Sequence, residues 1–400
     1  MKLLLRCAVA LICVHPAAAL AQEPAALPSS ATEPQGIVAE PGGITRAVLF
    51  ADRHLGKGDL TNGIYWDWGN MIPGAGWMSI GPGYKHWYGK DSLFVDASAS
   101  ISVHNYRMAQ ARVEAPTFLK SRLALGAQAR WQDFRSVDYF DVGSDTVLDF
   151  QSNYAIKSTQ VSAYATLRPT RWMDVGAQVG WMNPETSYVE GLFLRRLEGQ
   201  TTFVPMEVSA TIDTRDFPGH PTSGIVLRGV GARYDDRTTG NMSFDKTEAE
   251  AAGFLPIGGG RVVLAVHGWY VGTEPRTPGG SVPFYLQPSL GGLSTLRGYT
   301  DYRFHDDHMV VAQAELRLAL MTHVDLAVFG DAGNVAAHRD NLNFDKRSYG
   351  VGVRMHTRRE TFAMLDMAKG DEGWRFLFRL KDPLNLGRLN RKTAHVPFVP

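Results

Sequence analysis

The chain has 400 residues, of which 41 are basic and 40 are acidic, giving a formal net charge of +1. A hydrophobic content of 44% excludes a disordered chain, and the composition also excludes a collagen-like repeat. The chain lacks the basic excess of an electrostatic nucleic-acid binder, so a globular protein or a β-rich membrane protein remains.

The N-terminus has the pattern of a secretory signal peptide. Two basic residues precede an apolar run over residues 7–14, and small residues lead to a cleavage site after Ala21. We therefore predict a signal peptide over residues 1–21. Because Cys7 and Cys13 both fall in this segment, the exported chain cannot depend on disulfides or on thiolate chemistry.

Residues 22–58 are predicted to be a flexible periplasmic segment. The first part, residues 22–43, is rich in Ala, Pro, Glu and Ser, a composition typical of disorder. A short helix is predicted over residues 44–55, lying against or within the periplasmic mouth of the structure that follows. No later stretch approaches the roughly 18 apolar residues of a transmembrane helix.

From residue 63 onward the chain consists of alternating segments of about ten residues each, the pattern of successive strands. In residues 93–104, for example, Val95 and Ala97 alternate with Asp96 and Ser98. The same alternation is found in residues 123–132, 173–181, 204–213, 310–320 and 374–381.

These apolar faces fit a membrane barrel better than a soluble sandwich. A sandwich has bulky inner faces and shorter strands, whereas here long faces rich in Ala and Val oppose Gly, Ser and charged residues. Trp131, Trp181 and Trp374 lie at strand ends, as an aromatic girdle requires. We predict an all-β fold: a transmembrane antiparallel β-barrel of about sixteen strands over residues 59–382, followed by a periplasmic tail over residues 383–400.

The connections between the segments alternate in length, which independently supports a barrel. Short ones are predicted at residues 116–121, 169–170, 256–259, 321–322 and 357–360, and longer ones at residues 135–153, 183–201, 235–242, 273–307 and 336–346. The exception is residues 215–223. Short periplasmic turns and long outer loops are typical of a barrel in the outer membrane of a Gram-negative bacterium.

Four short motifs resemble those of the BamA/TamA family, also called the bacterial surface antigen family. The loop signature is formed by Leu296, Arg297, Gly298 and Tyr299, and residues 329–333 resemble the Phe-x-Asp-x-Gly strand motif. The periplasmic turn motif is formed by Asp213, Arg215, Asp216, Pro221 and Gly224, and residues 312–316 resemble the strand after the signature loop. The motifs occur in the order found in the family, and the resemblance covers roughly residues 122–380.

The resemblance implies that the signature loop folds back into the barrel, where its arginine meets an acid on the lumen wall. Alternation places Asp331 and Phe329 on the inward face of their strand, and Glu315 inward on the preceding one. We expect Arg297 to pair with Asp331 and to have Glu315 as a second partner, with Phe329 and Gly333 of the strand motif beside them.

The resemblance also implies a function: helping proteins to insert into, or to cross, the outer membrane by opening the seam between the first and last strands. Movement of lipid is a close variant. The alternative is a passive diffusion pore or structural barrel plugged by its signature loop.

The chain departs from the family in having no room before the barrel for the periplasmic repeat (POTRA) domains. The partners we expect are outer-membrane lipids, a client outer-membrane or secreted protein and a separate periplasmic protein, but no nucleic acid.

No catalytic or cofactor site is predicted. The spacings typical of serine hydrolases, zinc peptidases and phosphate-binding loops do not occur. Residues 305–308, His-Asp-Asp-His, resemble a crowded metal site, but adjacent residues of a strand point to opposite faces, so we interpret them as a polar loop. We therefore expect no enzyme, no cofactor and no metal.

Overall fold

The computed structural model describes residues 36–55, 62–69, 71–76, 78–89, 92–191, 199–358 and 360–380. The predicted signal peptide and the predicted tail lie outside these residues. The domain boundaries therefore stay a prediction.

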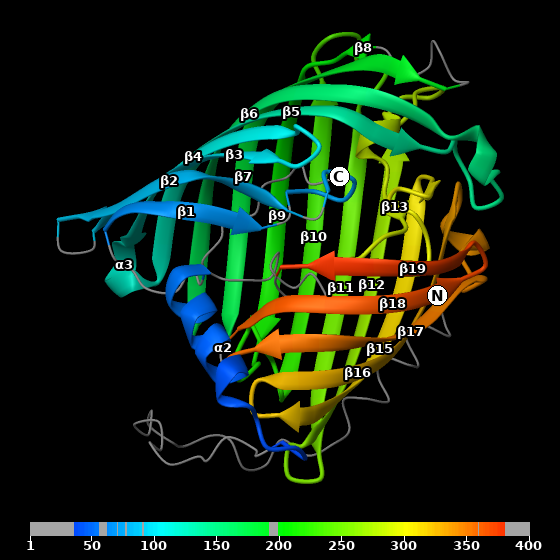
Figure 1. Ribbon diagram of the computed structural model, residues 1–400. Helices are drawn as coiled ribbons and strands as arrows, with labels where there is room; N and C mark the ends of the chain where they lie inside the picture. Colours follow the sequence, from blue (N-terminus) through cyan, green and yellow to red (C-terminus); the bar gives the residue numbers. More distant parts are fainter. Residues whose placement is uncertain are drawn as a thin grey trace, which may run out of the picture. The chain divides into compact units, whose positions relative to one another are not determined.

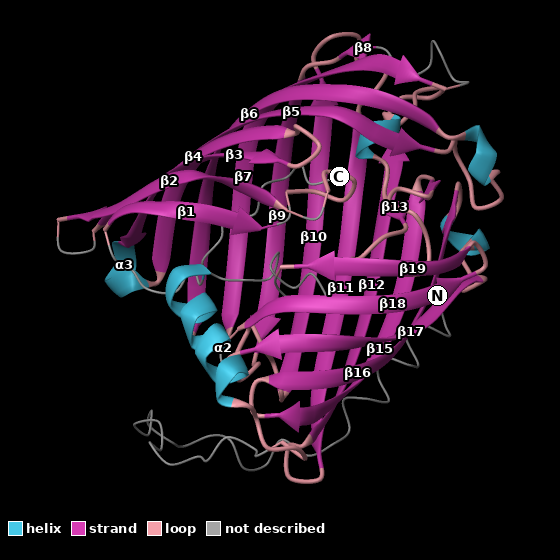
Figure 2. Ribbon diagram, viewed as in Figure 1, coloured by secondary structure: helices cyan, strands magenta, loops and turns pink. Residues whose placement is uncertain are grey.

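The described residues form a long run of strands with few helices (Figure 2). The first strands are β1 (Gly63–Gly69), β2 (Ser79–Tyr88), β3 (Leu93–Ser102), β4 (Arg107–Thr117), β5 (Leu123–Tyr139), β6 (Ser152–Thr170), β7 (Met173–Glu190), β8 (Gly199–Gln200) and β9 (Phe203–Asp213). They are followed by β10 (Gly224–Asp236), β11 (Phe244–Ile257), β12 (Val262–Pro275), β13 (Ser289–Leu290), β14 (Phe304–His305), β15 (His308–Met321), β16 (Val324–Ala336), β17 (Lys346–His356), β18 (Thr361–Gly370) and β19 (Gly373–Arg379). The helices are α2 (Gly42–Leu55), α3 (Phe118–Ser121), η1 (Leu148–Phe150), η2 (Phe284–Leu286) and η3 (Arg339–Asn341).

Without the two-residue strands β8, β13 and β14, sixteen of the nineteen strands remain in the described residues, and each pairs antiparallel with its neighbours in the chain (Figure 1). This agrees with the predicted all-β barrel of about sixteen strands. In the described part of the chain, β1 pairs with β2 and β19 pairs with β18, and no register joins β1 to β19. The sheet therefore has two free edges, and the gap between them is called the seam below.

Several strands are longer than the predicted ten residues. β5, β6 and β7 have 17, 19 and 18 residues and continue into the segments predicted as the loops 135–153 and 183–201. At this end of the barrel a buried aromatic cluster, which includes Phe134, Tyr154 and Phe203, packs inside the strands. The strands continue past ten residues because this cluster packs against their ends. The prediction of strand length was based on the alternating pattern of a membrane-spanning strand, which does not reveal a cluster of this kind.

The outward and inward faces follow the predicted alternation. In β16, Leu326 and Val328 are exposed on the outer face, whereas Asp325, Phe329 and Asp331 are buried on the inner one. The barrel wall therefore has an apolar outside and a charged inside, as a membrane barrel requires.

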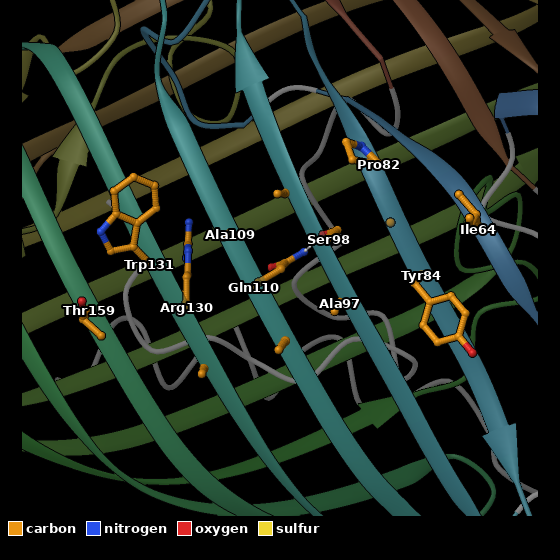
Figure 3. A pocket seen from close by; sticks show the side chains of 14 residues that line it. Ile64, Pro82, Tyr84, Ala97, Ser98, Ala109, Gln110, Arg130, Trp131 and Thr159 are labelled. Carbon is orange, nitrogen blue, oxygen red and sulfur yellow. Dashed lines mark hydrogen bonds between the residues drawn. The ribbon is translucent and has the colours of Figure 1, made fainter.

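On the outer face of β1 to β6 the wall has a shallow hollow of about 610 Å³. Its floor consists of small side chains such as Ala97, Ala109 and Ala129, and Tyr84 and Trp131 stand at its sides (Figure 3). The backbone therefore lies close to the outer surface on the strands that lead to the first edge of the seam.

The segment before β1 is attached at the end of the barrel that carries the short turns. The backbone amide of Val38 donates to Leu320 at 2.8 Å, and Glu40 accepts a hydrogen bond from the amide of His323 at 2.8 Å. Helix α2 then contacts both β1 and β18, with Val48 fully buried, and so lies across the seam (Figure 1). Among the described residues, no helix has the length and apolar character needed to cross a membrane.

Candidate functional site

The longest connection, residues 276–307 between β12 and β15, carries the loop signature. The short hairpin β13–β14 pairs Leu290 with Phe304 and so closes the loop on itself. Glycine is required at Gly298, where a Cβ atom would lie 2.6 Å from the backbone nitrogen of Gly370 in β18. The loop backbone can therefore lie directly against the barrel wall.

The two apolar members of the signature are buried. Leu296 is inaccessible to solvent and belongs to a cluster with Val311 and Val335 of the wall. The Tyr299 hydroxyl donates to Asp371 at 2.8 Å, and burial together with this carboxylate raises the pKa of Tyr299 to about 12. Both residues hold the loop inside the barrel.

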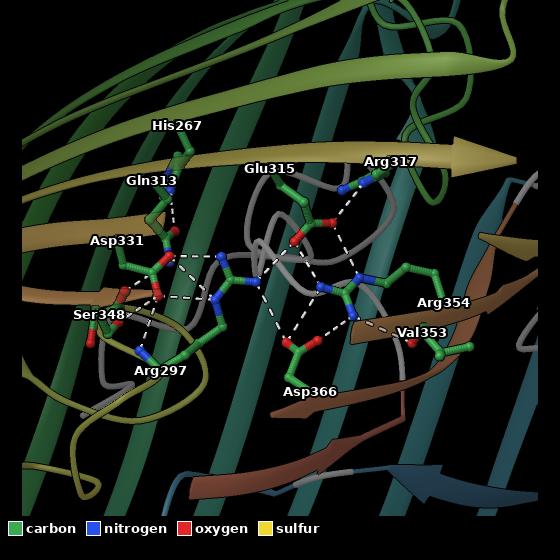
Figure 4. Close-up of polar contacts among 11 residues, drawn as sticks. His267, Arg297, Gln313, Glu315, Arg317, Asp331, Ser348, Val353, Arg354 and Asp366 are labelled. Atoms are coloured by element: carbon green, nitrogen blue, oxygen red, sulfur yellow. Dashed lines mark hydrogen bonds and ion pairs between the residues drawn. The ribbon is translucent and has the colours of Figure 1, made fainter. Parts of the chain in front are cut away.

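Arg297 is the central contact of the loop with the wall (Figure 4). Its Nη2 and Nε atoms donate to the two carboxylate oxygens of Asp331 at 2.7 and 3.0 Å, and its backbone amide donates to Asp331 at 3.2 Å. The guanidinium carbon lies 3.4 Å from the centre of the Phe329 ring. Arg297 has no exposed surface, so its position is set by a bidentate ion pair and a stacked ring.

Two further carboxylates surround the same guanidinium group. Arg297 Nη1 donates to Glu315 at 2.9 Å and lies 3.5 Å from Asp366 of β18. Burial alone would lower the pKa of Arg297, but Asp331, Glu315 and Asp366 together outweigh it and raise the pKa above its ordinary value. Arg297 therefore stays charged.

The charges in this network balance. Arg354 of β17 donates to Glu315 at 2.7 Å and also pairs with Asp366, and Arg317 donates to Glu315 at 2.9 Å. Three guanidinium groups thus face three carboxylates, so the cluster that Figure 4 shows carries no net charge. A neutral cluster of this kind avoids the high cost of an unpaired buried charge.

Neutral side chains orient the carboxylate of Asp331. Ser348 donates to Asp331 at 3.0 Å, and Gln313 donates at 3.3 Å to Asp331 and at 2.8 Å to the backbone of Thr295 in the loop. At Gly333 a Cβ atom would lie 2.5 Å from the oxygen of Val310, so glycine is needed beside the loop. The structure thus brings together the signature loop and the lumen residues that the sequence singled out.

The loop also contacts the last hairpin of the barrel. Besides the bond from Tyr299 to Asp371, Arg303 pairs with Glu372, and Arg375 of β19 donates to Thr300 at 2.8 Å. Because β19 is a free edge of the sheet, the loop supports the strand that forms one side of the seam.

The turn motif lies at the opposite mouth, between β9 and β10. Arg215 Nε and Nη2 each donate to Asp213 at 2.9 Å, and both side chains are buried. Asp216 accepts from the amides of Thr222 and Ser223 at 3.0 and 3.2 Å. Pro221 is buried, and Gly224 has a φ of +103° and leaves no room for a Cβ atom, which would lie 2.5 Å from the backbone oxygen of Thr214.

The tip of this turn reaches a distant part of the wall. The amide of Thr361 in β18 donates to Gly219 at 2.9 Å, and the Thr361 hydroxyl lies 2.9 Å from His220 Nδ1. Arg358 stacks over Phe217 at 5.4 Å. Burial, with the charges of nearby His356 and Arg317, holds the pKa of His220 well below its ordinary value. The turn therefore crosses the mouth as a strap.

The sequence reasoning did not single out Arg354, Asp366 or Ser348. All three lie on the inward faces of β17 and β18. Reading the alternation of residues 346–370 in the same way as that of β16 would have identified them as inward polar residues. It would not have shown which of them meet Arg297.

The His-Asp-Asp-His segment runs from the end of β14 to the start of β15. His305 pairs in β14 with Ser289, and its backbone oxygen accepts from Gly143 at 2.7 Å. Within the described residues, the side chains arranged to hold a metal ion are instead His220, Asp325 and His356.

The seam has features of its own in the described chain. β1 and β19, with seven residues each, are shorter than the other fourteen wall strands. Their outer faces carry the two most exposed large hydrophobic side chains in this part of the protein, Ile64 at 82% and Phe376 at 80%. Both free edges are thus short and strongly apolar on the outside.

Comparisons with known proteins agree with this geometry. Residues 92–358 match the model of the Omp85 superfamily domain. A BamA from Haemophilus ducreyi lacking POTRA domains 1–3 has a similar fold, with a TM-score of 0.63 and 16% identity over 80% of this chain and 70% of that one.

The CdiB proteins of Acinetobacter baumannii and Escherichia coli are also similar. Their TM-scores are 0.50 and 0.52, at 15% and 14% identity over 80% of this chain. The chain spans 59% and 62% of their lengths. A comparison with functionally characterised sequences found no match.

Proposed function

The chain belongs to the Omp85 superfamily and is a β-barrel of the Gram-negative outer membrane, and from this premise we propose that it helps proteins to insert into, or to cross, that membrane at the seam between β1 and β19. The predicted BamA/TamA resemblance and outer-membrane localisation are confirmed at this level. The client and any separate periplasmic partner belong to the proposal.

The unpaired seam is the observation that carries the proposal. In the described residues, the only strand register of β1 is with β2 and that of β19 is with β18, so no strand pairing joins the two sides of the seam. A free sheet edge can pair with an incoming extended segment, and its main-chain hydrogen bonds then bind the segment without requiring a particular sequence. A client strand in the membrane has the same need, since its backbone groups cannot be left unpaired in lipid.

The surroundings of the seam favour such an exchange. The hollow with its alanine floor lies on the strands that lead to β1 (Figure 3), and Ile64 and Phe376 extend from the two edges. Helix α2 contacts β1 and β18 at the short-turn mouth, which in an outer-membrane barrel is the periplasmic one. We assign helix α2 the role of holding the two edges near each other until a client arrives.

The signature loop supplies a rigid support for one edge. Its balanced ion pairs hold it to β15–β18, and its contacts with Asp371, Glu372 and Arg375 hold the β18–β19 hairpin. The edge of β19 is thus held by the loop, whereas β1 is held by β2 and by helix α2. The alternative, a pore or structural barrel plugged by the same loop, differs in predicting no acceleration of client folding.

The test is the folding of a client barrel into liposomes that contain this protein. We expect the protein to accelerate client folding, and we expect the acceleration to be lost when cysteines replacing Trp66 and Phe376 are joined across the seam by a cleavable bifunctional maleimide. Cleavage of the linker should restore it. These positions lie on the outer faces of β1 and β19.

The matched control joins cysteines at Val95 and Val113, which are paired directly on the outer faces of β3 and β4. This link should leave the acceleration unchanged. A protein that gives steady conductance in planar bilayers and no acceleration, with or without the seam link, would be a pore, and the proposal would be wrong.

A further inference from the structure

Three side chains that belong to neither the ion-pair network nor the seam meet at the periplasmic mouth. His220 comes from the turn between β9 and β10, Asp325 from the start of β16, and His356 from the end of β17. All three are buried, with 5%, 6% and 8% of their surfaces exposed. The turn thus brings one histidine to a carboxylate and a histidine on a different part of the wall.

The distances among these groups suit a metal ion. Asp325 Oδ1 lies 3.1 Å from His356 Nε2, and Asp325 Oδ2 lies 3.7 Å from His220 Nε2. One ligand atom from each residue lies within 4.8 Å of the others. Bonds of about 2.0–2.2 Å to zinc place two ligand atoms of a tetrahedron about 3.3–3.6 Å apart. The measured separations of 3.1 and 3.7 Å lie just below and just above this range.

The Nε2 atoms of both histidines face the carboxylate of Asp325. His356 Nδ1 lies 3.1 Å from the backbone oxygen of Thr357, and because a carbonyl oxygen only accepts, Nδ1 carries the hydrogen. His356 Nε2 lies 3.1 Å from Asp325 Oδ1, and a metal ion held between these two atoms would take the place of a hydrogen in this contact.

The outer contacts of the two rings are those of metal-bound histidines. The backbone oxygen of Thr357 holds one ring, and the hydroxyl of Thr361, 2.9 Å from His220 Nδ1, holds the other. Such bonds to the second ring nitrogen orient histidine ligands and fix their tautomer. The nearby positive charge of Arg317 is paired with Glu315 at 2.9 Å, which reduces its repulsion of a cation.

We propose that His220, Asp325 and His356 bind one divalent transition-metal ion of the zinc class, with water completing the tetrahedron. Two histidines and one carboxylate form a donor set that suits such ions. The rings are stacked 3.8 Å apart and nearly parallel, at 7°, so binding tilts them toward a common point. The ion clamps the turn to β16 and β17 and closes the strap across the periplasmic mouth, whatever the activity at the seam.

The experiment uses the full chain in detergent, prepared without a polyhistidine tag and stripped with EDTA. Zinc is titrated by calorimetry, and cobalt is added as a spectroscopic probe of tetrahedral geometry. We expect one equivalent of zinc to bind, and at least tenfold weaker binding in His220→Ala, His356→Ala and Asp325→Asn. The matched control is His338→Ala, which removes an exposed histidine at the opposite mouth.

Folding is checked by heat-modifiable migration on gels, and the three substitutions keep the proposal testable if one of them fails to fold. In the wild type, zinc should slow hydrogen exchange in residues 214–223, and in His220→Ala it should not. Absence of binding, retention of full affinity in His220→Ala, or an equal loss in His338→Ala would each overturn the proposal.

Discussion

Two segments leave the barrel wall and reach across the lumen, one from each mouth, and they are held in different ways. The outer loop is fixed by Arg297, whose carboxylate partners Asp331 and Glu315 lie 34 and 18 residues away in the chain. The periplasmic turn is shaped by Arg215, whose partner Asp213 is two residues away. Its contacts with the far wall are made by a backbone hydrogen bond, by His220 and by a stacked arginine.

The difference shows which segment is permanently fixed and which is adjustable. A buried ion pair gains little net stability, but it strongly disfavours every arrangement that leaves one of its charges unpaired. The loop therefore has one position. The turn keeps its local shape wherever it lies, because both members of its ion pair belong to the turn. Its attachment to the far wall depends on a few polar contacts. We therefore expect the turn to be displaced from the wall more easily than the loop.

Removing the loop arginine should have the largest effect. Arg297→Ala leaves Asp331 and Glu315 buried with one cation fewer, which costs about 3–5 kcal/mol for a buried pair. We expect the loop to leave the wall, raising hydrogen exchange in residues 291–299 and abolishing client folding. The barrel itself should still migrate as a heat-modifiable band, because strand pairing does not involve this side chain.

The control for this experiment is Arg347→Ala, which removes an exposed arginine of β17 next to Ser348. It should change neither exchange nor activity. If Arg297→Ala left the exchange of residues 291–299 as it is in the wild type, the loop would be held by its apolar cluster rather than by its charges, and the contrast with the turn would disappear.

Removing the turn arginine should have a smaller effect on client folding and a strictly local effect on structure. Arg215→Ala leaves one buried carboxylate, that of Asp213, without its bidentate partner, at a cost of about 3–5 kcal/mol for a buried pair. Hydrogen exchange should rise in residues 214–223 and stay unchanged in residues 291–299. Exchange that rises in both segments would mean that the two are coupled.

For comparison, Arg237→Ala breaks an exposed contact with Asp235 at 3.6 Å. Exposed pairs contribute little, so this variant should behave as the wild type. A measurable effect of Arg237→Ala would mean that exchange in this region responds to charge in general.

Much of the fold and the central pair were predictable because alternation is a local property. Once residues 324–333 are read as a strand, Asp331 must face inward, and the loop motif supplies a cation to meet it. The same reasoning located Glu315. The predicted family and fold class are confirmed for this reason.

The remaining features depend on long-range register, which a local pattern does not contain. Alternation could place Arg354 and Asp366 inward, but their meeting with Glu315 depends on how β15, β17 and β18 are staggered. The reach of the turn to Thr361 joins strands that are not neighbours in the sheet. The lengths of β5 to β7 depend on an aromatic cluster built from distant segments.

The N-terminal segment provides the smallest expected effect and sharpens the comparison at the periplasmic mouth. Burial acts to raise the pKa of Glu40, but hydrogen bonds from Thr45 and His323 and the charge of His323 outweigh it, so the pKa lies below 4.5. The ionised carboxylate therefore stabilises the attachment of α2 above pH 4.5, and this contribution is lost as the pH falls through the lowered pKa.

A spin label at the exposed Arg46 of α2 should be equally immobile at pH 7 and pH 5 and become mobile at lower pH. Glu40→Gln should show some of this mobility already at pH 7, because it removes the charge but keeps an oxygen that accepts from Thr45 and from the amide of His323. Asp149→Asn, a substitution in the exposed helix η1, serves as the control and should change nothing. A label that stays immobile in Glu40→Gln at every pH would show that α2 is held by its packing on β1 and β18 alone. The attachment of α2 would then be as permanent as that of the loop.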